Sequence, residues 1–202
     1  MNNNSAKTRT ITGMAVLTAI VVVLQWLASI LPPFGTFHIN LVLTPIIVGA
    51  ALYGAWAGGW LGFVFGVVVL LTDAGAFLAV DVAGTIVTCI LKGVLSGLAA
   101  GLVYRLCAKK SVLLATILGG ICAAVVNTGV FLLGCCVFFY DTVAAWGAAV
   151  GFENTATYML VGFVGVNFLV ELGVNLVLSS ATTRIVTLRQ KSEGGVSCAA
   201  GH

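Results

Sequence analysis

Long apolar runs separated by short polar segments dominate this chain of 202 residues. An apolar helix needs about 20 residues to cross a hydrocarbon core that is about 30 Å thick. We expect an all-α integral membrane protein, because runs of this length recur along the whole chain. The predicted membrane-spanning helices cover residues 11–31, 40–54, 57–72, 82–104, 112–139 and 158–183.

The division between the second and third spans rests on length. Residues 39–72 carry no charge, and as one helix they would be about 50 Å long at about 1.5 Å per residue. Such a helix is much longer than a bilayer core. The chain is therefore predicted to fold back within residues 53–58, and six spans is the consistent count.

Basic residues give this topology a direction, because cytoplasmic loops retain Lys and Arg. Eight of the nine Lys and Arg residues lie where alternate spans end, and the ninth, Lys92, lies inside an apolar run. The pattern places both termini in the cytoplasm and the protein in the cell membrane. The eight residues are Lys7, Arg9, Arg105, Lys109, Lys110, Arg184, Arg189 and Lys191.

Composition agrees with a membrane location, since 60% of the residues are hydrophobic and 7% are charged. A soluble domain carries about 25% charged residues. The net charge of +3 reflects the loops, and nothing in it indicates nucleic-acid binding. We expect one six-helix domain over residues 1–191 and a small, polar, disordered cytoplasmic tail over residues 192–202.

Small residues recur at helical spacing in three of the predicted spans. Glycines at every fourth position place small faces on the third and fourth spans, where neighbouring backbones can approach closely. Ala15 and Ala19 form a similar face on the first span. The glycines are Gly54, Gly58, Gly62 and Gly66, then Gly93, Gly97 and Gly101.

Polar residues inside the spans are the stronger functional signal, because each is costly in lipid unless it faces protein or a cavity. Lys92 and Glu171 both lie 13 residues before a cytoplasmic arginine, so we expect them at similar depth. Asn127 and Asn167 also match each other in depth, and Asn167, Glu171 and Asn175 follow one helical stripe. Either Lys92 and Glu171 form a structural ion pair, or these groups line a ligand pocket, which is the interpretation we favour.

Missing motifs narrow the class of protein. The sequence contains no GxxxxGK[ST] phosphate loop, so ATP hydrolysis by that route is excluded. Its two histidines are His38 in a loop and His202 in the tail, which leaves no histidine base or metal ligand within a span. We therefore expect no enzyme activity, no catalytic residue, no metal site and no cofactor.

Several of these segments resemble a known family. Residues 40–54, followed by Gly58 and by residues 62–66, are similar to the second and third helices of the substrate-binding S components of energy-coupling factor (ECF) vitamin transporters. Residues 92–97 are also similar to members of this family. The Asn127-Thr128 pair most resembles the pantothenate-type branch.

This resemblance implies a six-helix subunit that binds a vitamin from outside and works with a T component and two ABC ATPases. Ala15 and Ala19 match the AxxxA motif that docks the T component. The resemblance places the pocket near the external side, among the later helices and the loops after the first, third and fifth spans. The candidate substrate-binding residues are Phe37, His38, Asn40, Asp73, Asp81, Lys92, Asn127, Trp146, Asn167 and Glu171.

The substrate is left open by the residues themselves. An unpaired Lys92 favours a carboxylate ligand such as pantothenate, whereas a Lys92–Glu171 pair suits a neutral polar ligand and a dominant Glu171 suits a cationic one. The alternative to an S component is a self-sufficient protein, either a secondary transporter with Glu171 as its proton carrier or a membrane enzyme. The sequence shows no convincing internal symmetry of the kind that secondary transporters often have.

Overall fold

A bundle of long helices forms the protein, and short helices connect them. The computed structural model describes residues 3–30 and 41–199, and these residues form no strand. The helices are α1 (Asn3–Ile30), α2 (Leu43–Tyr53), α3 (Ala55–Thr72), α4 (Gly75–Leu78), α5 (Val82–Cys107), α6 (Val112–Phe138), α7 (Tyr140–Ala149), α8 (Thr155–Thr157), the π-helix η1 (Tyr158–Phe163) and α9 (Gly165–Ala199).

Five described helices are long and apolar enough to cross a membrane, within α1, α3, α5, α6 and α9. The all-helical membrane class predicted from the sequence is thereby confirmed. The predicted span 40–54 forms α2, which has 11 residues and a length of about 16 Å. It is too short to cross the core alone. Among the described residues the structure therefore gives five full-length spans and one short apolar helix, and the count of six spans stays a prediction.

The predicted reversal between α2 and α3 occurs at Gly54. Its φ of +92° lies in a region that side chains rarely adopt, so glycine is needed there. After the turn, Gly58 packs against α2, where an added Cβ would lie 2.8 Å from the Cβ of Ala50. The two helices therefore fold against each other, as predicted from the length of the uncharged run 39–72.

Glycine contacts hold α3 and α5 together along an antiparallel interface. A Cβ on Gly62 would collide with the carbonyl oxygen of Gly93, and one on Gly58 or Gly66 would meet the backbone of Gly97 or Cys89. The small residues thus allow direct contact between the two backbones. This confirms the close approach predicted from the glycine spacing.

Polar side chains begin α5 and α6. Asp81 and Ser111 are the N-cap residues, and their side-chain oxygens accept hydrogen bonds from the backbone N–H groups of Ala83 (3.0 Å) and Leu114 (3.4 Å). Such bonds satisfy N–H groups that the first turn of a helix leaves without partners. The local sequence therefore sets where the two central helices start.

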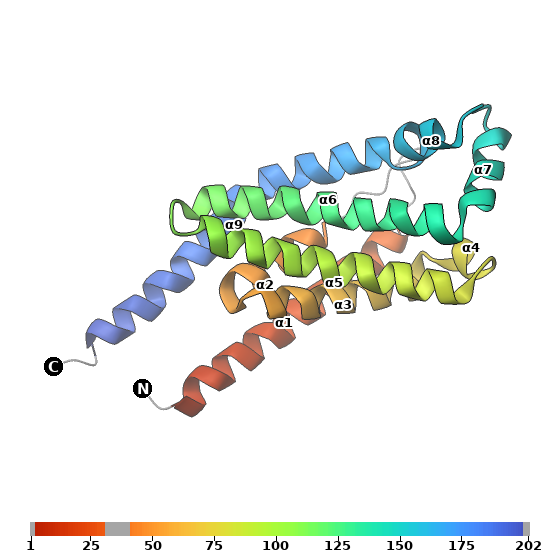
Figure 1. Ribbon diagram of the computed structural model, residues 1–202. Coiled ribbons are helices and arrows are strands. Elements are labelled where there is room, and N and C mark those ends of the chain that lie inside the picture. Colours follow the sequence, from red (N-terminus) through yellow and green to blue (C-terminus); the bar gives the residue numbers. More distant parts are fainter. Residues whose placement is uncertain (1–2, 31–40, 200–202) are drawn as a thin grey trace.

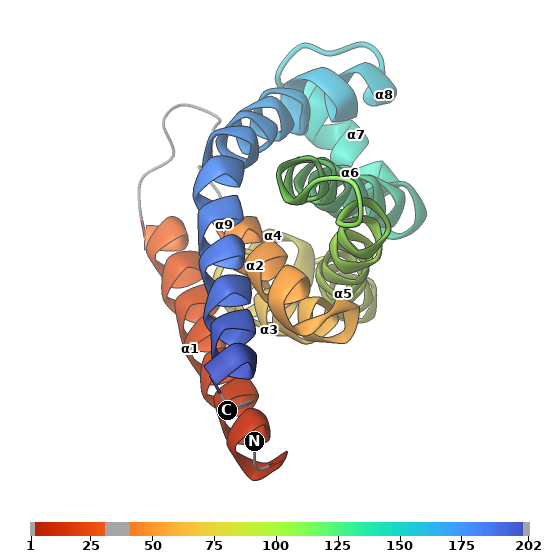
Figure 2. The ribbon, with the colours of Figure 1, turned by 90° about the vertical axis from the view of Figure 1, so that its left-hand side faces the viewer.

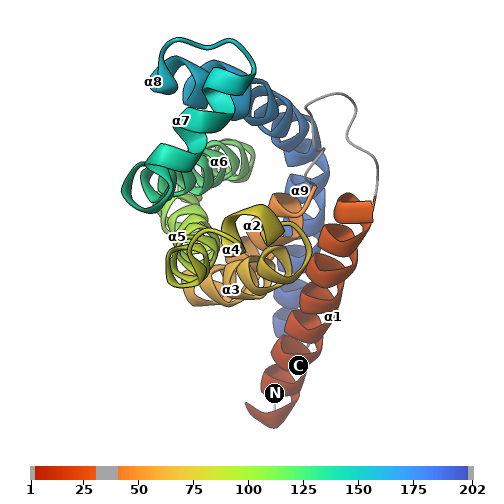
Figure 3. The same cartoon turned by 90° about the vertical axis from the view of Figure 1, so that its right-hand side faces the viewer.

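The two ends of the bundle differ in charge. The start of α1, the α5–α6 connection and the end of α9 lie at one end (Figure 1). The eight basic residues of the sequence pattern belong to α1, α5, α9 and the α5–α6 connection. The short helices α4, α7 and α8 lie at the other end (Figure 3). Both termini thus lie on one side of the bundle, and the cytoplasmic orientation of that side stays a prediction.

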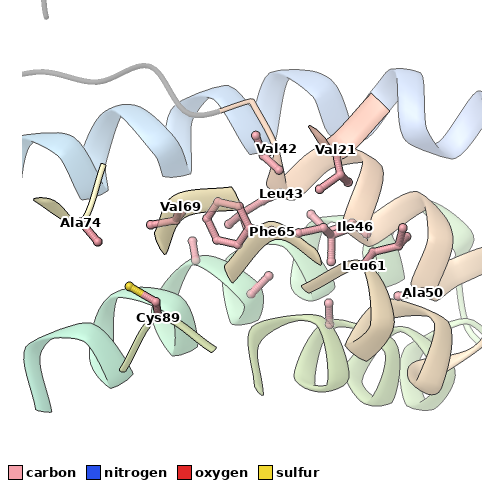
Figure 4. Packing of buried hydrophobic residues seen from close by; sticks show 14 residues of the cluster. Val21, Val42, Leu43, Ile46, Ala50, Leu61, Phe65, Val69, Ala74 and Cys89 are labelled. Carbon is pink, nitrogen blue, oxygen red and sulfur yellow. The ribbon is translucent and has the colours of Figure 1, made fainter. Parts of the chain in front are cut away.

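Viewed along the bundle, α1 lies at its edge beside α2 and α3, whereas α5 and α6 lie on the opposite side (Figure 2). The main hydrophobic core lies between them. Leu43 and Ile46 of α2 gather with Leu61 and Phe65 of α3, while Cys89 of α5 lies further along the cluster (Figure 4). Since few α1 residues are buried, most of this helix remains available to lipid or to a partner.

The last predicted span, 158–183, differs from the structure at both ends. It begins as the π-helix η1, and the helix is interrupted at Val164 before α9 starts. At its other end α9 continues to Ala199, where we expected a disordered tail from residue 192. Extending an existing helix by one residue costs much less than starting a new one, which explains how a polar segment can continue it.

Candidate functional site

A cavity of about 520 Å³ lies inside the bundle, among α1, α3, α4, α5, α6, η1 and α9. Val69, Ala74 and Cys89, which Figure 4 labels at one end of the core cluster, belong to its wall. Its volume falls in the range of about 300–1,000 Å³ that is typical of small-molecule sites. The wall is mostly apolar and includes the polar side chains of Gln25, Asp73, Lys92, Asn127, Thr128, Tyr158 and Glu171.

Lys92 enters this cavity from α5 and contacts aromatic rings. Its Nζ lies 5.7 Å from the ring centre of Phe65 and 5.1 Å from that of Phe131. Cation–π contacts of this kind stabilise an ammonium group where water is scarce. Although Glu171 lines the same cavity, the two charges are not within the 4.0 Å N–O distance of an ion pair. Lys92 therefore keeps its N–H donors for another acceptor.

Two buried residues of the cavity wall, on α6 and α9, carry acceptor oxygens. Asn127 is 7% exposed and Glu171 is 4% exposed. Within the described part of the chain, Oδ1 of Asn127 and Oε1 of Glu171 have no hydrogen-bond partner. Because an unsatisfied buried acceptor costs about 1–3 kcal/mol, these atoms favour a ligand that brings donors.

The polar stripe on α9 continues away from the cavity. Asn175, one turn beyond Glu171, is buried and accepts a hydrogen bond from Oγ1 of Thr44 on α2, at 3.5 Å. Further along, the hydroxyl groups of Thr183 and Thr116 lie 2.7 Å apart and link α9 to α6. Beyond Glu171, the polar side chains of this stripe therefore join α9 to neighbouring helices, which is a structural role.

Gln25 on α1 is a cavity residue that the sequence analysis missed. It is 3% exposed, and its Nε2 donates a hydrogen bond of 2.5 Å to Oδ2 of Asp73. Its Oε1 is buried and has no partner among the described residues. A single amide within a long apolar helix is costly in lipid. This cost was the signal in the sequence that could have identified Gln25.

Aromatic side chains gather at the α4 end of the cavity. Phe77 of α4 makes edge-to-face contacts with Phe131, Phe139 and Trp146, with ring centres 5.8, 4.9 and 5.4 Å apart. These rings join α4, α6 and α7, and edge-to-face pairs add about 0.5–1.5 kcal/mol each beyond the burial of their area. Phe77 and Phe131 line the cavity, whereas Trp146 packs behind them.

The cavity brings together four of the predicted substrate-binding residues, namely Asp73, Lys92, Asn127 and Glu171. Asp81 and Trp146 do not line it, because the first caps α5 and the second packs on Phe77. Asn167 belongs to α9, and its side chain is outside the described part. Phe37, His38 and Asn40 lie outside the described residues.

The predicted docking residues lie away from the cavity. Ala15 and Ala19 are both exposed on α1, one turn apart. Large apolar side chains next to them are exposed as well, including Val16 at 54% and Ile20 at 41%. This face is open for contact with lipid or with another protein.

The cavity has the chemistry of a binding site. It offers one cation, several acceptors and a largely apolar wall, an arrangement that fixes the orientation of a small polar molecule. Among the residues that the structure describes, no group of three or more His, Cys, Asp and Glu side chains is placed to hold a metal ion.

Comparison with known proteins gives a family. The family model described as "ECF transporter, substrate-specific component" matches residues 9–181, well over half of the chain. Searches of curated proteins and of solved structures gave no match. The matched residues include all five long apolar helices in whole or in part, together with the cavity. The chain therefore belongs to the family of ECF transporter substrate-specific components, whose members are multi-pass membrane transport subunits and not catalytic enzymes.

Proposed function

We propose that this protein captures a vitamin or a related small micronutrient in the cavity around Lys92, and that pantothenate is the first candidate. One observation carries the proposal. Gln25, Asn127 and Glu171 line the same cavity as Lys92, and each has a buried oxygen with no hydrogen-bond partner among the described residues, while the Lys92 ammonium group is not ion-paired to Glu171. The cavity is therefore complementary to an anionic molecule with several hydrogen-bond donors.

Pantothenate has this combination of groups. Its carboxylate can accept charge-assisted hydrogen bonds from Lys92, and its two hydroxyl groups and amide N–H can donate to the three unpartnered oxygens. Its short hydrocarbon parts suit the apolar wall of the cavity. Lys92 and Glu171 then act separately, which agrees with the absence of an ion pair between them.

Delivery of the substrate requires partners. Family members in general work with T and ATPase modules, and the sequence contains no phosphate-binding loop of its own. We infer that one T component and two ABC ATPases supply the energy. Ala15 and Ala19 support docking through α1, because their exposed small side chains leave a flat face for a partner helix.

A second candidate function rests on Glu171. A buried carboxylate, one oxygen of which has no partner in the described part of the chain, could carry a proton in a self-sufficient transporter. Glu171→Gln separates the two functions, because the amide keeps a hydrogen-bond acceptor at this place but cannot carry a proton. We expect this variant to retain most of its affinity for pantothenate, whereas a proton carrier would lose its uptake completely.

The substrate proposal is tested on the purified protein. Native mass spectrometry should reveal a bound molecule by its mass, and calorimetric titration with pantothenate should give saturable binding to ligand-free protein. Lys92→Met should weaken that binding, and Thr18→Val, which alters a half-buried residue outside the cavity, should leave it unchanged. Absence of pantothenate binding to the stable wild-type protein would reject this substrate.

A further inference from the structure

One side chain connects α1 to the cavity by a polar contact. Gln25 is buried, while the next two residues of α1, Trp26 and Leu27, are 59% and 48% exposed. The rest of the buried stripe on this helix is apolar, with Val21 one turn earlier at 0%. An amide at such a position is costly unless its groups are paired, so packing alone does not explain Gln25.

The hydrogen bond from Gln25 to Asp73 joins a buried residue of the cavity wall to an exposed one. Gln25 lies inside, whereas Asp73 is exposed and directly follows the last residue of α3. Both residues belong to the cavity wall, together with Ala28 of α1 and Phe77 of α4. The bond therefore closes the wall between α1 and the segment that joins α3 to α4.

The amide of Gln25 has a second polar group, the oxygen Oε1. Its Nε2 is committed to Asp73, but its Oε1 is buried and without a partner among the described residues. A donor group of a bound molecule can satisfy this oxygen while Nε2 keeps its bond to Asp73. One side chain can thus contact the wall and the bound molecule at the same time.

We propose that Gln25 is a positioning residue of the substrate cavity, which holds Asp73 across the gap between α1 and the α3–α4 connection and so controls access to the cavity from that side. This inference rests on the proposed function, in which this cavity is the substrate site. Because α1 also carries Ala15 and Ala19, the helix expected to meet the T component then forms part of the binding site.

Cys89 provides a direct measure of access. Its free thiol lines the cavity and is 6% exposed. In a variant that retains Cys89 as its single cysteine, the rate of modification by 2-sulfonatoethyl methanethiosulfonate can be followed by intact-protein mass spectrometry. The reagent is water-soluble and anionic, so the rate reports how easily an aqueous solute reaches the cavity.

Two substitutions of opposite charge form the matched pair. Gln25→Lys can still donate to Asp73 and should keep the rate within about twofold of the parent, since an ion-paired hydrogen bond replaces the original one. Gln25→Glu cannot donate as a carboxylate and repels Asp73, so the rate should rise at least about tenfold. The negative charge of the reagent would by itself give the reverse order of rates, because glutamate repels the anion and lysine attracts it. A faster reaction in Gln25→Glu than in Gln25→Lys therefore does not come from the charge of the reagent.

Two further variants complete the experiment. Thr18→Val removes the hydrogen bond of 3.3 Å from Trp60 Nε1, which also joins α1 to α3 but lies outside the cavity, and the rate should not change. Gln25→Leu removes the donor at similar size and should act like Gln25→Glu, which keeps the test valid if the charged variant fails to fold.

Equal rates for the lysine and glutamate variants, or an unchanged rate for Gln25→Leu, would overturn the proposal. An equal increase in Thr18→Val would also overturn it, by showing that any loosening of α1 exposes Cys89. Since the assay contains no vitamin, a failure here leaves the substrate proposal standing. Conversely, a failure of pantothenate to bind does not affect the labelling result.

Discussion

Lys92 and Glu171 show how the surroundings of a residue decide its role. Both are ionisable groups within long apolar helices, where a charge without compensation is costly. Lys92 is stabilised by two aromatic rings, and Glu171 lines the same cavity without an ion pair to Lys92. This separation leaves both groups available to a bound molecule.

Substitution of the two charges separates ligand binding from structural pairing. Because Lys92 is not within ion-pair distance of Glu171, Lys92→Met should fold normally. It should lose about 1.5–3 kcal/mol of affinity for pantothenate, the range for a hydrogen bond to a charged group. The double variant Lys92→Met with Glu171→Met should not regain that affinity. Titrations beside thermal melting curves of all three variants measure both effects.

A structural ion pair predicts a different pattern. Each single variant would then leave an uncompensated buried charge and melt at lower temperature, and the double variant would recover. Restored affinity in the double variant would therefore rule out direct contact between Lys92 and the ligand.

Among the elements, those predicted best are the long apolar helices with small-residue faces. Predicted spans 57–72, 82–104 and 112–139 match α3, α5 and α6 within a few residues, because length and apolar character alone define them. The short length of α2 and the π-helix η1 have no comparable signal, since they depend on how the chain packs. Gln25 differs from them, because an amide in an apolar helix is a signal, but the sequence does not show its partner Asp73, which lies 48 residues away.

Gly62 tests the close contact between α3 and α5. Gly62→Ala should lower stability by about 1–3 kcal/mol, because the new Cβ would collide with the backbone of Gly93 and overpack the interface. Gly129→Ala is the control, as it lies in the interior of α6 with nothing within 4 Å of its added Cβ. Alanine should be neutral or stabilising there, by up to about 1 kcal/mol. Melting temperatures in detergent would compare the two, and equal values would contradict the interface.

The exposed face of α1 is tested by adding bulk. Ala15→Trp combined with Ala19→Trp should abolish uptake in cells that supply the T component and the ATPases, because the face can no longer meet a partner helix closely. Pantothenate binding by the purified variant should remain nearly unchanged, since neither alanine lines the cavity. Uptake in cells and titration of the purified protein measure the two effects, and equal loss of both would mean that this face belongs to the internal packing.

For the whole molecule, the arrangement separates binding from energy supply. The cavity lies inside the bundle, while most of α1 remains exposed at its edge (Figure 2). Gln25 lies on the same helix as the proposed docking face and contacts the cavity wall. A subunit of this shape can hold a ligand by itself but depends on a partner at α1 for transport.

Reconstitution tests that dependence. The protein alone in liposomes should bind pantothenate but accumulate none of it, with or without ATP, because the chain carries no phosphate-binding loop. Addition of a T component and its ATPases should make accumulation depend on ATP, and the Ala15→Trp, Ala19→Trp variant should not respond to them. Accumulation of labelled pantothenate is measured under an imposed proton gradient as well. Uptake driven by that gradient in the isolated protein, and lost in Glu171→Gln, would instead make Glu171 the proton carrier of a self-sufficient transporter.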